Sequence, residues 1–321
     1  MSPAAKKALI TGITGQDGIF LAQFLLGKGY RVTGVLAHGH VHVTARMDKA
    51  GLTDKIEIKT CVLTNAKDVA QLLDEIKPDE IYNLAAVSSV KLSFDTPYDS
   101  IHFNVLTVTA FLESIRLSGL DIKFYQASSS EMFGNADALP ITENTPFKPT
   151  SPYAISKVTG HMLVKYYRSV CKVFCCAGIL FNHESVLRPP HFVSKKILSA
   201  AIRISKGSKE KLSLGNISVK RDWGYAPEYI KAMWLMLQQP EPDDYVIATG
   251  EAHSLQEFIE IVFKELGMNW QEHVVIDKDL YRPADIKEIW GDPRKAKDRL
   301  GWAYDLSFPK FVSTLVKEEM Q

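Results

Sequence analysis

Four polar side chains near the middle of the chain have the types and spacing of an acid–base set. Tyr153 and Lys157 lie four residues apart, Ser129 comes before them, and Glu131 follows Ser129 by two positions. A phenol, an ammonium and a hydroxyl suit nicotinamide-dependent sugar oxidation, because the cation favours the phenolate that accepts the alcohol proton. Glu131 adds a carboxylate that plain oxidation does not need, although its local sequence fits a surface carboxylate equally well. With it, the set could oxidise a sugar, eliminate water and return the hydride, which favours a dehydratase over a dehydrogenase.

These side chains require a helix and a strand that meet at one end. A Ser-Pro pair is typical of a helix start, and we expect a helix over residues 153–170. That helix would project Tyr153 and Lys157 from one face, because residues four apart are neighbours on a helix surface. A strand over residues 123–126 would end near Ser129.

The first half of the chain alternates short apolar runs with helical segments, which is typical of a parallel sheet covered by helices on both faces. After about residue 180, helices and short strands are mixed. We therefore predict an α/β fold, with a Rossmann-type doubly wound parallel sheet in residues 1–180 and a smaller mixed α/β domain in residues 181–321. A helix near residues 227–238 is expected to pack back on the first domain. The expected strands are residues 8–11, 31–36, 55–59, 80–84, 123–126 and 173–180, and the expected helices are residues 19–27, 66–76, 97–117 and 153–170.

A glycine-rich turn joins the first expected strand to the first expected helix. Gly12 permits a tight turn, Gly15 lets the backbone approach a pyrophosphate, and Gly18 lets helix and strand pack closely. The helix N-terminus would face the phosphate charge. The turn therefore predicts a dinucleotide site, with a tight turn that binds nothing as the alternative, and its spacing resembles the short-chain dehydrogenase/reductase superfamily. The cofactor residues expected here are Gly12, Thr14, Gly15, Gln16, Asp17 and Gly18.

Composition and charge argue against several classes of protein. The net charge is +1 with both signs mixed along the chain, so we expect neither a nucleic-acid partner nor a membrane partner. We find no signal-peptide pattern and no apolar run of the roughly 18 residues that span a bilayer, and we expect a cytoplasmic protein. His38, His40 and His42 alternate without a carboxylate or cysteine at ligand spacing, so no metal site is predicted. The cysteines, expected to be reduced, are Cys61, Cys171, Cys175 and Cys176.

Several motifs spread over nearly the whole chain closely resemble the GDP-mannose 4,6-dehydratases, a family of the extended short-chain dehydrogenase/reductase group. They occur in the family's order and spacing, and those at residues 178–185 and 220–224 are much more specific than the glycine loop. The motifs are TGITGQDG (residues 11–18), NLAA (83–86), YQASSSEMFG (125–134), SPYAISK (151–157), GILFNHES (178–185), KRDWG (220–224), RPAD (282–285) and GDPRKAK (291–297).

The resemblance implies a reaction without net redox change. Tyr153, held by Lys157 and assisted by Ser129, would take the proton of the sugar 4-hydroxyl while the C4 hydride passes to the nicotinamide. The 4-ketone acidifies the C5 proton, which Glu131 would remove and return to the departing 6-hydroxyl as water leaves. Hydride then adds at C6 and a proton at C5, which gives a 4-keto-6-deoxy sugar nucleotide. The family usually has Thr where this chain has Ser129, a change that keeps the hydroxyl.

The resemblance also implies binding residues. Cations beside a diphosphate make physical sense, although Lys196 and Arg221 would also fit a solvated basic face. Asp285 stands where the family usually has Glu. The implied cofactor residues are Leu84, Ala86 and His183 together with Tyr153 and Lys157, and the implied substrate residues are Ser88, Asn182, Lys196, Arg221, Arg282 and Asp285.

The chain departs from the family around the adenosine half of the cofactor. His38, Gly39 and His40 replace the family's Arg-Arg-Ser, which binds the 2′-phosphate of NADP and helps to build the tetramer in relatives. Arg46 matches a later family arginine that could reach the phosphate, and Val62 replaces an Asp near the adenine. No acidic residue ends the second strand to bind the ribose of NAD. We therefore expect NADP, with NAD as the alternative, and either a homodimer or a homotetramer.

The leading hypothesis is a member of this family that dehydrates GDP-mannose. Val87 replaces a family Gln, and Val186 and Pro189 alter a segment that approaches the sugar. The first alternative is therefore a 4,6-dehydratase of another nucleotide sugar, such as a GDP-heptose. The second is a catalytically silent paralogue that binds a nucleotide sugar. The altered adenosine site suggests it, and the intact acid–base set opposes it.

Overall fold

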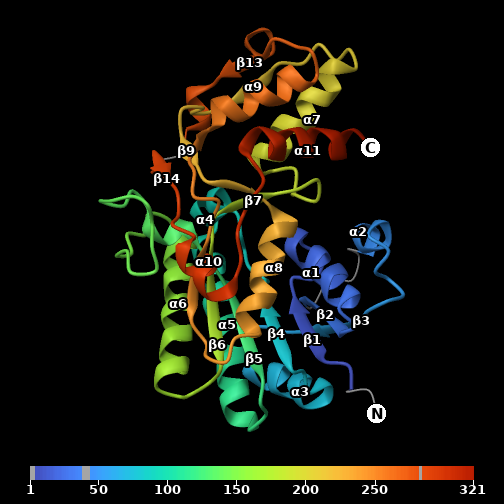
Figure 1. Cartoon of the computed structure of the whole chain (residues 1–321), viewed down its shortest axis with the longest axis vertical. Helices are drawn as coiled ribbons and strands as arrows, with labels where there is room; N and C mark the ends of the chain where they lie inside the picture. The colour runs from blue at the N-terminus through green and yellow to red at the C-terminus, as the bar shows by residue number, and fades with distance from the viewer. Residues whose placement is uncertain (1–3, 38–43, 282–283) are drawn as a thin grey trace.

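A seven-stranded sheet occupies the lower half of the computed structural model, which describes residues 4–37, 44–281 and 284–321 (Figure 1). Every pair of neighbouring strands is parallel, in the order β11-β6-β5-β4-β1-β2-β3. The chain moves outward from β1 to β3 and then crosses to β4 on the other side of β1. Such a sheet binds ligands beyond the carboxyl ends of its strands, where the order reverses. The strands are β1 (Lys7–Thr11), β2 (Arg31–Ala37), β3 (Glu57–Cys61), β4 (Glu80–Asn83), β5 (Lys123–Ser129), β6 (Cys175–Leu180) and β11 (Asp244–Ile247).

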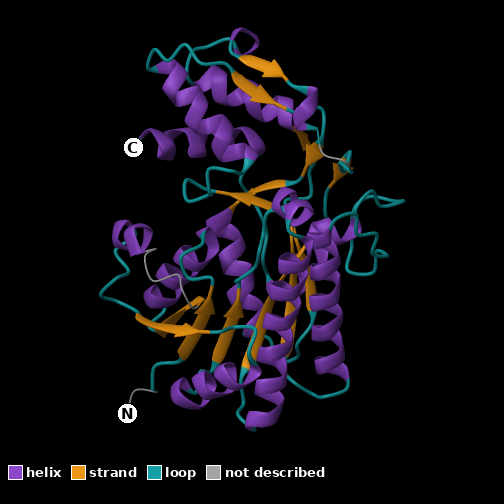
Figure 2. Cartoon of the chain, turned by 180° about the vertical axis from the view of Figure 1, so that it is seen from behind, coloured by secondary structure: helices purple, strands orange, loops and turns teal. Residues whose placement is uncertain are grey.

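Helices cover both faces of this sheet (Figure 2). One face packs against α1 and α8, and the other against α3, α5 and α6, so that two hydrophobic cores enclose the strands. The predicted Rossmann-type α/β fold is thereby confirmed. The covering helices are α1 (Gln16–Gly27), α3 (Ala66–Ile76), α5 (Pro97–Ser118), α6 (Pro152–Ser169) and α8 (Ala226–Leu237), and the short helices α2 (Thr44–Lys49) and α4 (Val90–Asp95) lie in the connections.

Local sequence signals set the ends of the helices that flank the site. The Ser151 side chain accepts a hydrogen bond from the N–H of Ala154 (3.1 Å), and Pro152 occupies the first turn of α6. In the same way the side chain of Asn65 caps α3, which ends at Lys77 in the left-handed conformation. The cap on α6 fixes the start of the helix that carries the predicted Tyr and Lys pair.

The upper half holds a smaller group of elements around a core of its own (Figure 1). Helices α7, α9 and α11 pack against one another, and α7 also packs on β8 of the strand pair β13-β8. Two more small sheets, β10-β7 and β12-β9-β14, complete the fold. The elements are α7 (Val193–Ser205), α9 (Leu255–Glu265), α11 (Phe308–Met320), β7 (Asn182–Glu184), β8 (Leu212–Leu214), β9 (Lys220–Arg221), β10 (Trp223–Tyr225), β12 (His253–Ser254), β13 (Val274–Ile276), β14 (Glu288–Ile289) and the 3-10 turns η1 (Ser130–Phe133), η2 (Trp270–Glu272) and η3 (Lys278–Leu280).

Residues after position 180 contribute to the large sheet as well as to the upper half. Helix α8 packs against α1, β11 pairs with β6, and α10 (Arg294–Leu300) packs against both β11 and α8. The sheet and its helices thus include residues on both sides of position 180. The division into domains 1–180 and 181–321 stays a prediction.

Most expected elements lie within two residues of the observed ones. Strand β5 runs to Ser129, three residues past its expected end, because its last residues pair with β6. Helix α1 begins at Gln16, directly after the glycine loop, and β3 covers residues 57–61 rather than 55–59. Strand β11 is missing from the expected strands, because its four residues gain their partner from the distant β6.

Candidate active site

Two adjoining pockets lie at the carboxyl ends of the parallel strands. The polar pocket is bounded by the ends of β5 and β6, the start of α6 and residues of the upper half. The glycine-loop pocket is bounded by residues 12–18, the end of β2 and the segment after β4. The residues that line both pockets, and so join them into one site, are Asp17, Leu84, Ala86, Ser88, Arg188 and Phe192.

The structure brings most of the predicted site residues to these two pockets. The whole acid–base set and five of the six expected substrate residues line the polar pocket, and all six expected glycine-loop residues line the glycine-loop pocket. Arg282, the sixth substrate residue, lies outside the described residues. The predicted residues of the polar pocket are Asp17, Leu84, Ala86, Ser88, Ser129, Glu131, Tyr153, Lys157, Asn182, His183, Lys196, Arg221 and Asp285.

The glycine loop has a backbone that side chains would obstruct at two positions. Gly12 has a φ of +68°, and a Cβ atom there would lie 2.9 Å from the backbone nitrogen of Ala85. A Cβ atom at Gly18 would lie 2.3 Å from the carbonyl oxygen of Gly12. The loop then enters α1 directly, so backbone N–H groups and the helix N-terminus border the glycine-loop pocket. These features fit the pyrophosphate of a dinucleotide.

The phenol and the ammonium of the acid–base set lie side by side on the first turns of α6. Tyr153 and Lys157 are both buried, and the Lys157 Nζ lies 5.6 Å from the centre of the Tyr153 ring. The Lys157 Nζ also donates a hydrogen bond to the carbonyl oxygen of Ala127 in β5 (2.8 Å). Ser129, at the end of β5, hydrogen-bonds with Tyr153. The end of β5 therefore holds both the Tyr153 phenol and the Lys157 ammonium of α6 in place.

Burial pushes both groups toward their neutral forms. It raises the pKa of Tyr153 to about 12, although the hydrogen bond from Ser129 acts in the opposite direction. It lowers the pKa of Lys157 to about 8, against the influence of the Asp17 carboxylate. Strongly perturbed groups of this kind, gathered in a polar pocket, are typical of functional sites.

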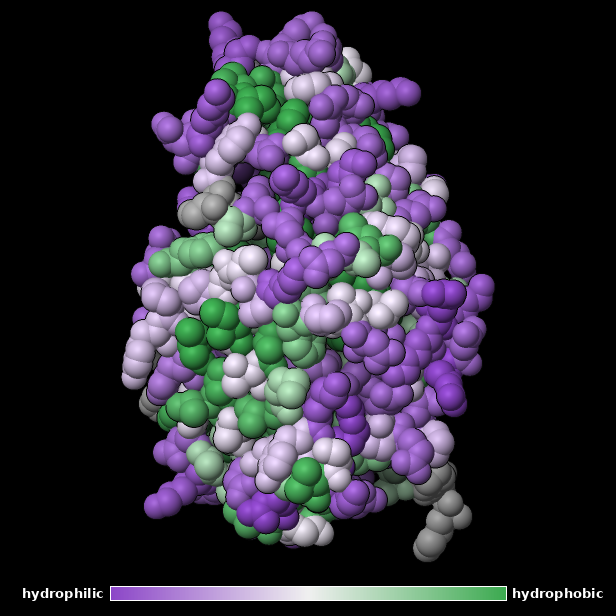
Figure 3. Space-filling view, turned by 90° about the vertical axis from the view of Figure 1, so that its left-hand side faces the viewer, coloured by the Kyte–Doolittle hydropathy of each residue, from purple (hydrophilic) through white to green (hydrophobic). Residues whose placement is uncertain are grey.

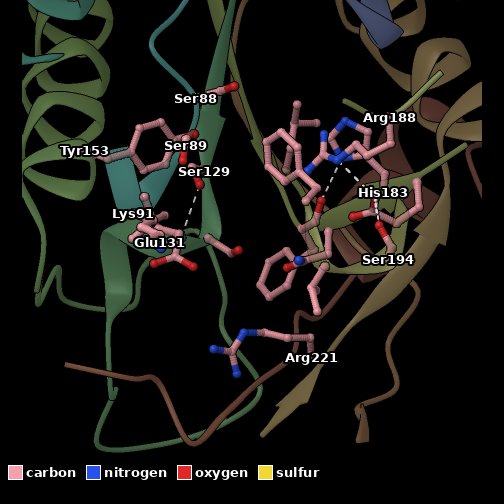
Figure 4. A pocket seen from close by; sticks show the side chains of 18 of the residues that line it. Ser88, Ser89, Lys91, Ser129, Glu131, Tyr153, His183, Arg188, Ser194 and Arg221 are labelled. Atoms are coloured by element: carbon pink, nitrogen blue, oxygen red, sulfur yellow. Dashed lines mark hydrogen bonds and ion pairs between the residues drawn. The ribbon is translucent and has the colours of Figure 1, made fainter. Parts of the chain in front are cut away.

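Glu131 adds a carboxylate to the same wall of the polar pocket. It lies on η1, and its backbone N–H donates to the Oγ of Ser129 (3.2 Å). Figure 4 shows its side chain on the side of the pocket that carries Ser129 and Tyr153. A hydroxyl, a phenol and a carboxylate thus face the space that a small substrate would occupy.

The opposite side of the polar pocket carries a buried cation and an exposed one. The guanidinium of Arg221, in β9, donates to the carbonyl oxygen of Ile286 (2.7 Å) and forms an ion pair with Asp285 (3.2 Å). Lys196, on α7, is exposed and donates to the carbonyl oxygen of Ser213 (2.7 Å). Asp285 therefore supports Arg221 in addition to lining the pocket.

An ion pair ties the glycine loop to β7. The Nε2 of His183 lies 2.9 Å from the Oδ2 of Asp17. Burial opposes charge on both groups, yet the attraction between them lowers the pKa of Asp17 to about 2 and raises the pKa of His183 above its ordinary value. Both shifts favour the charged forms of the pair.

Arg188 is a site residue that the sequence analysis missed. It lines both pockets, its Nε lies 3.0 Å from Glu184, and its guanidinium carbon lies 3.8 Å from the centre of the Phe192 ring. Figure 4 shows it on the same wall as His183. Its place three residues after the motif at residues 178–185, between the altered positions Val186 and Pro189, was the available signal. The exposed Lys91, on α4, also lines the polar pocket and was not anticipated.

The end of the glycine-loop pocket beside β2 and β3 is largely apolar. Val35, Leu36 and Ala37 line it at the end of β2, and Leu63 lines it after β3. Arg46 is not among its lining residues, and its guanidinium donates to the carbonyl oxygen of Leu187. Half-exposed Val62 is likewise absent from the lining. The stretch from His38 to His42, with its expected departures, lies outside the described residues.

No group of three His, Cys, Asp or Glu side chains within the described ranges could hold a metal ion. None of the helices in those ranges has the length and the apolar character needed to cross a membrane.

Comparisons of sequence identify relatives over the full length of the chain. A family model described as GDP-mannose 4,6 dehydratase matches residues 9–315. GDP-mannose 4,6 dehydratase 2 of Arabidopsis thaliana is 45% identical over 98% of this chain and 87% of its own length. The GDP-mannose 4,6 dehydratase of Dictyostelium discoideum is 40% identical over 100% of this chain and 98% of its own length, and the human one is 39% identical over 98% and 91%.

Solved structures share the fold at lower identity. The UDP-glucose 4-epimerase of Thermotoga maritima, solved with UDP-glucose, has a TM-score of 0.85 at 20% identity, covering 97% of this chain and 98% of that one. The dTDP-glucose 4,6-dehydratase of Bacillus anthracis, solved in complex with NAD, has a TM-score of 0.83 at 20% identity, covering 98% and 96%. These likenesses show the fold alone. The matches in sequence show more, and the chain belongs to the GDP-mannose 4,6-dehydratase family.

Proposed function

We propose that this enzyme removes water from GDP-mannose by internal hydride transfer from C4 to C6, which gives GDP-4-keto-6-deoxy-mannose. The observation that carries the proposal is the position of Glu131 beside Ser129 and Tyr153 on one wall of the polar pocket. An epimerase or a reductase would use the hydroxyl and the phenol, but it has no need of that carboxylate. Membership of the dehydratase family supports the same reaction.

Tyr153 is the proposed base for the sugar 4-hydroxyl, with Ser129 hydrogen-bonded to the same oxygen. A bound oxidised nicotinamide supplies the hydride acceptor and a positive charge that favours the phenolate. The ammonium of Lys157 acts in the same direction, against the burial that raises the pKa of Tyr153. The carbonyl oxygen of Ala127 holds that ammonium in place.

Glu131 is the proposed acid and base of the elimination. The ketone at C4 makes the C5 proton acidic, and the carboxylate of Glu131 takes this proton. The resulting carboxyl group gives the proton to the 6-hydroxyl, which leaves as water. Glu131 is then ionised again, as at the start of the step. Return of the hydride to C6 and addition of a proton at C5 complete the product, and the proton that Tyr153 took from the 4-hydroxyl balances the one added at C5.

The cations on the opposite wall are the proposed diphosphate site. Arg221 and Lys196 can neutralise phosphate charge, and a guanidinium offers paired donors to phosphate oxygens. Arg282 is proposed for the same role. Ser88, Asn182 and Asp285 would then contact the sugar side of the substrate from the lining of the polar pocket.

We propose NADP as the cofactor, bound across the two pockets. Among the described residues at the end of β2, the pocket is lined by Val35, Leu36 and Ala37, with no carboxylate for the ribose of NAD. The family resemblance of the sequence supports NADP. The cofactor released from the purified protein, identified by its mass, tests this assignment, and release of NAD alone would overturn it.

We propose that the protein forms a homodimer through the side on which α5 and α6 lie, alone or as half of a homotetramer. Figure 3 shows apolar residues gathered on this side of the molecule. On α6 they recur at helical spacing, so they form one stripe. The exposed apolar residues of the two helices are Tyr98, Ile101, Leu106, Leu117, Ile155, Met162 and Tyr166.

Incubation with GDP-mannose tests the proposed substrate. The purified protein is mixed with GDP-mannose without added cofactor, and the masses of the products are measured by mass spectrometry. We expect the substrate to lose the mass of one water. Unchanged GDP-mannose in the presence of both NADP and NAD would overturn the assignment. Turnover of a GDP-heptose in the same assay would then assign the other nucleotide sugar.

A further inference from the structure

Both N–H donors of the Gln16 side chain, and its oxygen, are hydrogen-bonded to other residues of the protein. Its Nε2 donates to the carbonyl oxygen of His183 (3.1 Å) and to the Oδ1 of Asp17 (3.0 Å). Its Oε1 accepts from the Oγ of Ser185 (2.8 Å). An amide has two N–H donors, and both are committed here. Gln16 is also buried, with 4% of its surface exposed, so it acts on the protein rather than on a ligand.

Both ring nitrogens of His183 are likewise hydrogen-bonded within the protein. Its Nδ1 lies 2.7 Å from the carbonyl oxygen of Phe181, and its Nε2 lies 2.9 Å from the carboxylate of Asp17. A carbonyl and a carboxylate can only accept, so both ring nitrogens must donate, and the ring is an imidazolium. The ring of Tyr229 stacks on it with the centres 4.8 Å apart. His183 is therefore fixed by three contacts.

These contacts join two segments that both border the dinucleotide site. Gln16 and Asp17 belong to the glycine loop and the first turn of α1, whereas His183 and Ser185 begin the segment 183–192. Further along this segment, Arg188, Pro189 and Phe192 line the glycine-loop pocket together with the glycines. The segment 183–192 is thus one wall of the glycine-loop pocket. Hydrogen bonds join the first residues of this segment to the glycine loop on the other side of the pocket.

We propose that Gln16, Asp17, His183 and Ser185 form a latch, which holds the segment 183–192 against the glycine loop and keeps the dinucleotide bound between removal and return of the hydride. This inference rests on the proposed function, in which one dinucleotide must serve both transfers within a turnover. An open wall would release the reduced dinucleotide, and the enzyme would stop with a 4-keto sugar. Gln16 and His183 are positioning residues in this account, since their polar atoms contact the protein.

The latch can be tested by the rate at which the reduced dinucleotide dissociates. Gln16→Leu removes both connections of the amide to the segment at similar size, and Ser185→Ala removes one of them. Gln23→Leu is the matched control, because Gln23 lies on the same helix, donates to the carbonyl oxygen of Ala50 (3.0 Å) and is exposed. Dissociation is followed by NADPH fluorescence after addition of excess NADP, without any sugar. Thermal melting confirms that each variant is folded.

We expect dissociation to be about tenfold faster or more in Gln16→Leu, several-fold faster in Ser185→Ala and unchanged in Gln23→Leu, since each lost hydrogen bond weakens the closed wall. With GDP-mannose, Gln16→Leu should also release a 4-keto sugar that still carries its 6-hydroxyl. Wild-type dissociation rates in both Gln16→Leu and Ser185→Ala would overturn the latch, as would an equal acceleration in Gln23→Leu. The fluorescence assay contains no sugar, so failure of the proposed substrate would leave its result intact.

Discussion

At the scale of residues, burial and charge oppose each other in the acid–base set. Burial raises the pKa of Tyr153 to about 12 and lowers the pKa of Lys157 to about 8, so the protein alone favours a neutral phenol. A base for the sugar hydroxyl needs the phenolate. In the proposed mechanism, the positive charge of an oxidised nicotinamide would lower the pKa of Tyr153, so that the phenolate needed as the base would form when the cofactor is bound.

Replacement of Glu131 by Gln separates oxidation from elimination. The amide keeps the size of the side chain but cannot take the C5 proton. We expect dehydration to fall roughly a hundredfold or more, as for loss of a general acid or base. Oxidation at C4 should persist, so reduced dinucleotide should accumulate on the enzyme and be visible by its absorbance. An equal loss of both steps would contradict the assigned role.

The hydroxyl of Ser129 can be tested with a matched pair of variants. Ser129→Ala removes the partner of the Tyr153 phenol, and we expect dehydration to fall about a hundredfold, comparable to loss of one well-placed hydrogen-bond donor. Ser129→Thr keeps the hydroxyl and restores the residue usual in the family, so its kcat should stay close to that of the wild type. Steady-state kinetics on both variants would contradict this role if Ala and Thr behaved alike.

At the scale of elements, the ion pair between Asp17 at the start of α1 and His183 in β7 connects the glycine loop to the substrate side of the site. Burial lowers the pKa of His183, the Asp17 carboxylate raises it, and the Arg188 cation also lowers it. Because the net shift is upward, the stabilisation by the imidazolium is complete below about pH 6.5 and is lost as the pH rises through the raised pKa. At the acid end it is lost as the pH falls toward the pKa of Asp17, about 2.

His183→Gln should therefore lower the Tm most at mildly acidic pH. We expect the difference from the wild type to be largest at about pH 5 and to shrink at alkaline pH. His273→Gln, at a partly exposed position in the upper half, is the control and should show no such trend. A loss of Tm in His183→Gln that stays constant from about pH 5 to pH 9 would contradict a charged pair.

The elements differ in how far local sequence determines them. The strands β1, β2, β4 and β5 are largely buried on both faces, so their apolar runs between turn residues identified the Rossmann-type sheet, whereas the edge strand β3 is largely exposed. The cap at Ser151 likewise predicted the start of α6. Strand β11 has only four residues, and its place beside β6 depends on how α8 packs, which no local pattern records.

The residues of the site also differ in how far local sequence predicts them. The acid–base set was predictable because strand ends and helix turns place its members. Arg188 was missed because it lies in an irregular segment whose path is set by contacts with the glycine loop. The contact of Arg46 with the carbonyl oxygen of Leu187, rather than with the pocket lining, also depends on packing that spacing cannot reveal.

At the scale of the whole molecule, the exposed apolar stripe on α6 predicts self-association. Met162 is 50% exposed and Tyr166 is 51% exposed, and these two side chains are neighbours on the helix. Met162→Glu would place a charge in the proposed interface, and we expect it to shift the protein to monomers in light scattering after size exclusion. Lys209→Glu, at an exposed position in the upper half, should leave the assembly unchanged. A monomeric wild type would contradict the proposal.

The most direct test of the central claim follows a single hydrogen through the reaction. The enzyme is given GDP-mannose deuterated at C4, and the position of deuterium in the product is determined by NMR. Internal hydride transfer predicts a product that has lost one water and carries the deuterium at C6. A dehydrated product without deuterium at C6, or a product that keeps its 6-hydroxyl, would contradict the account.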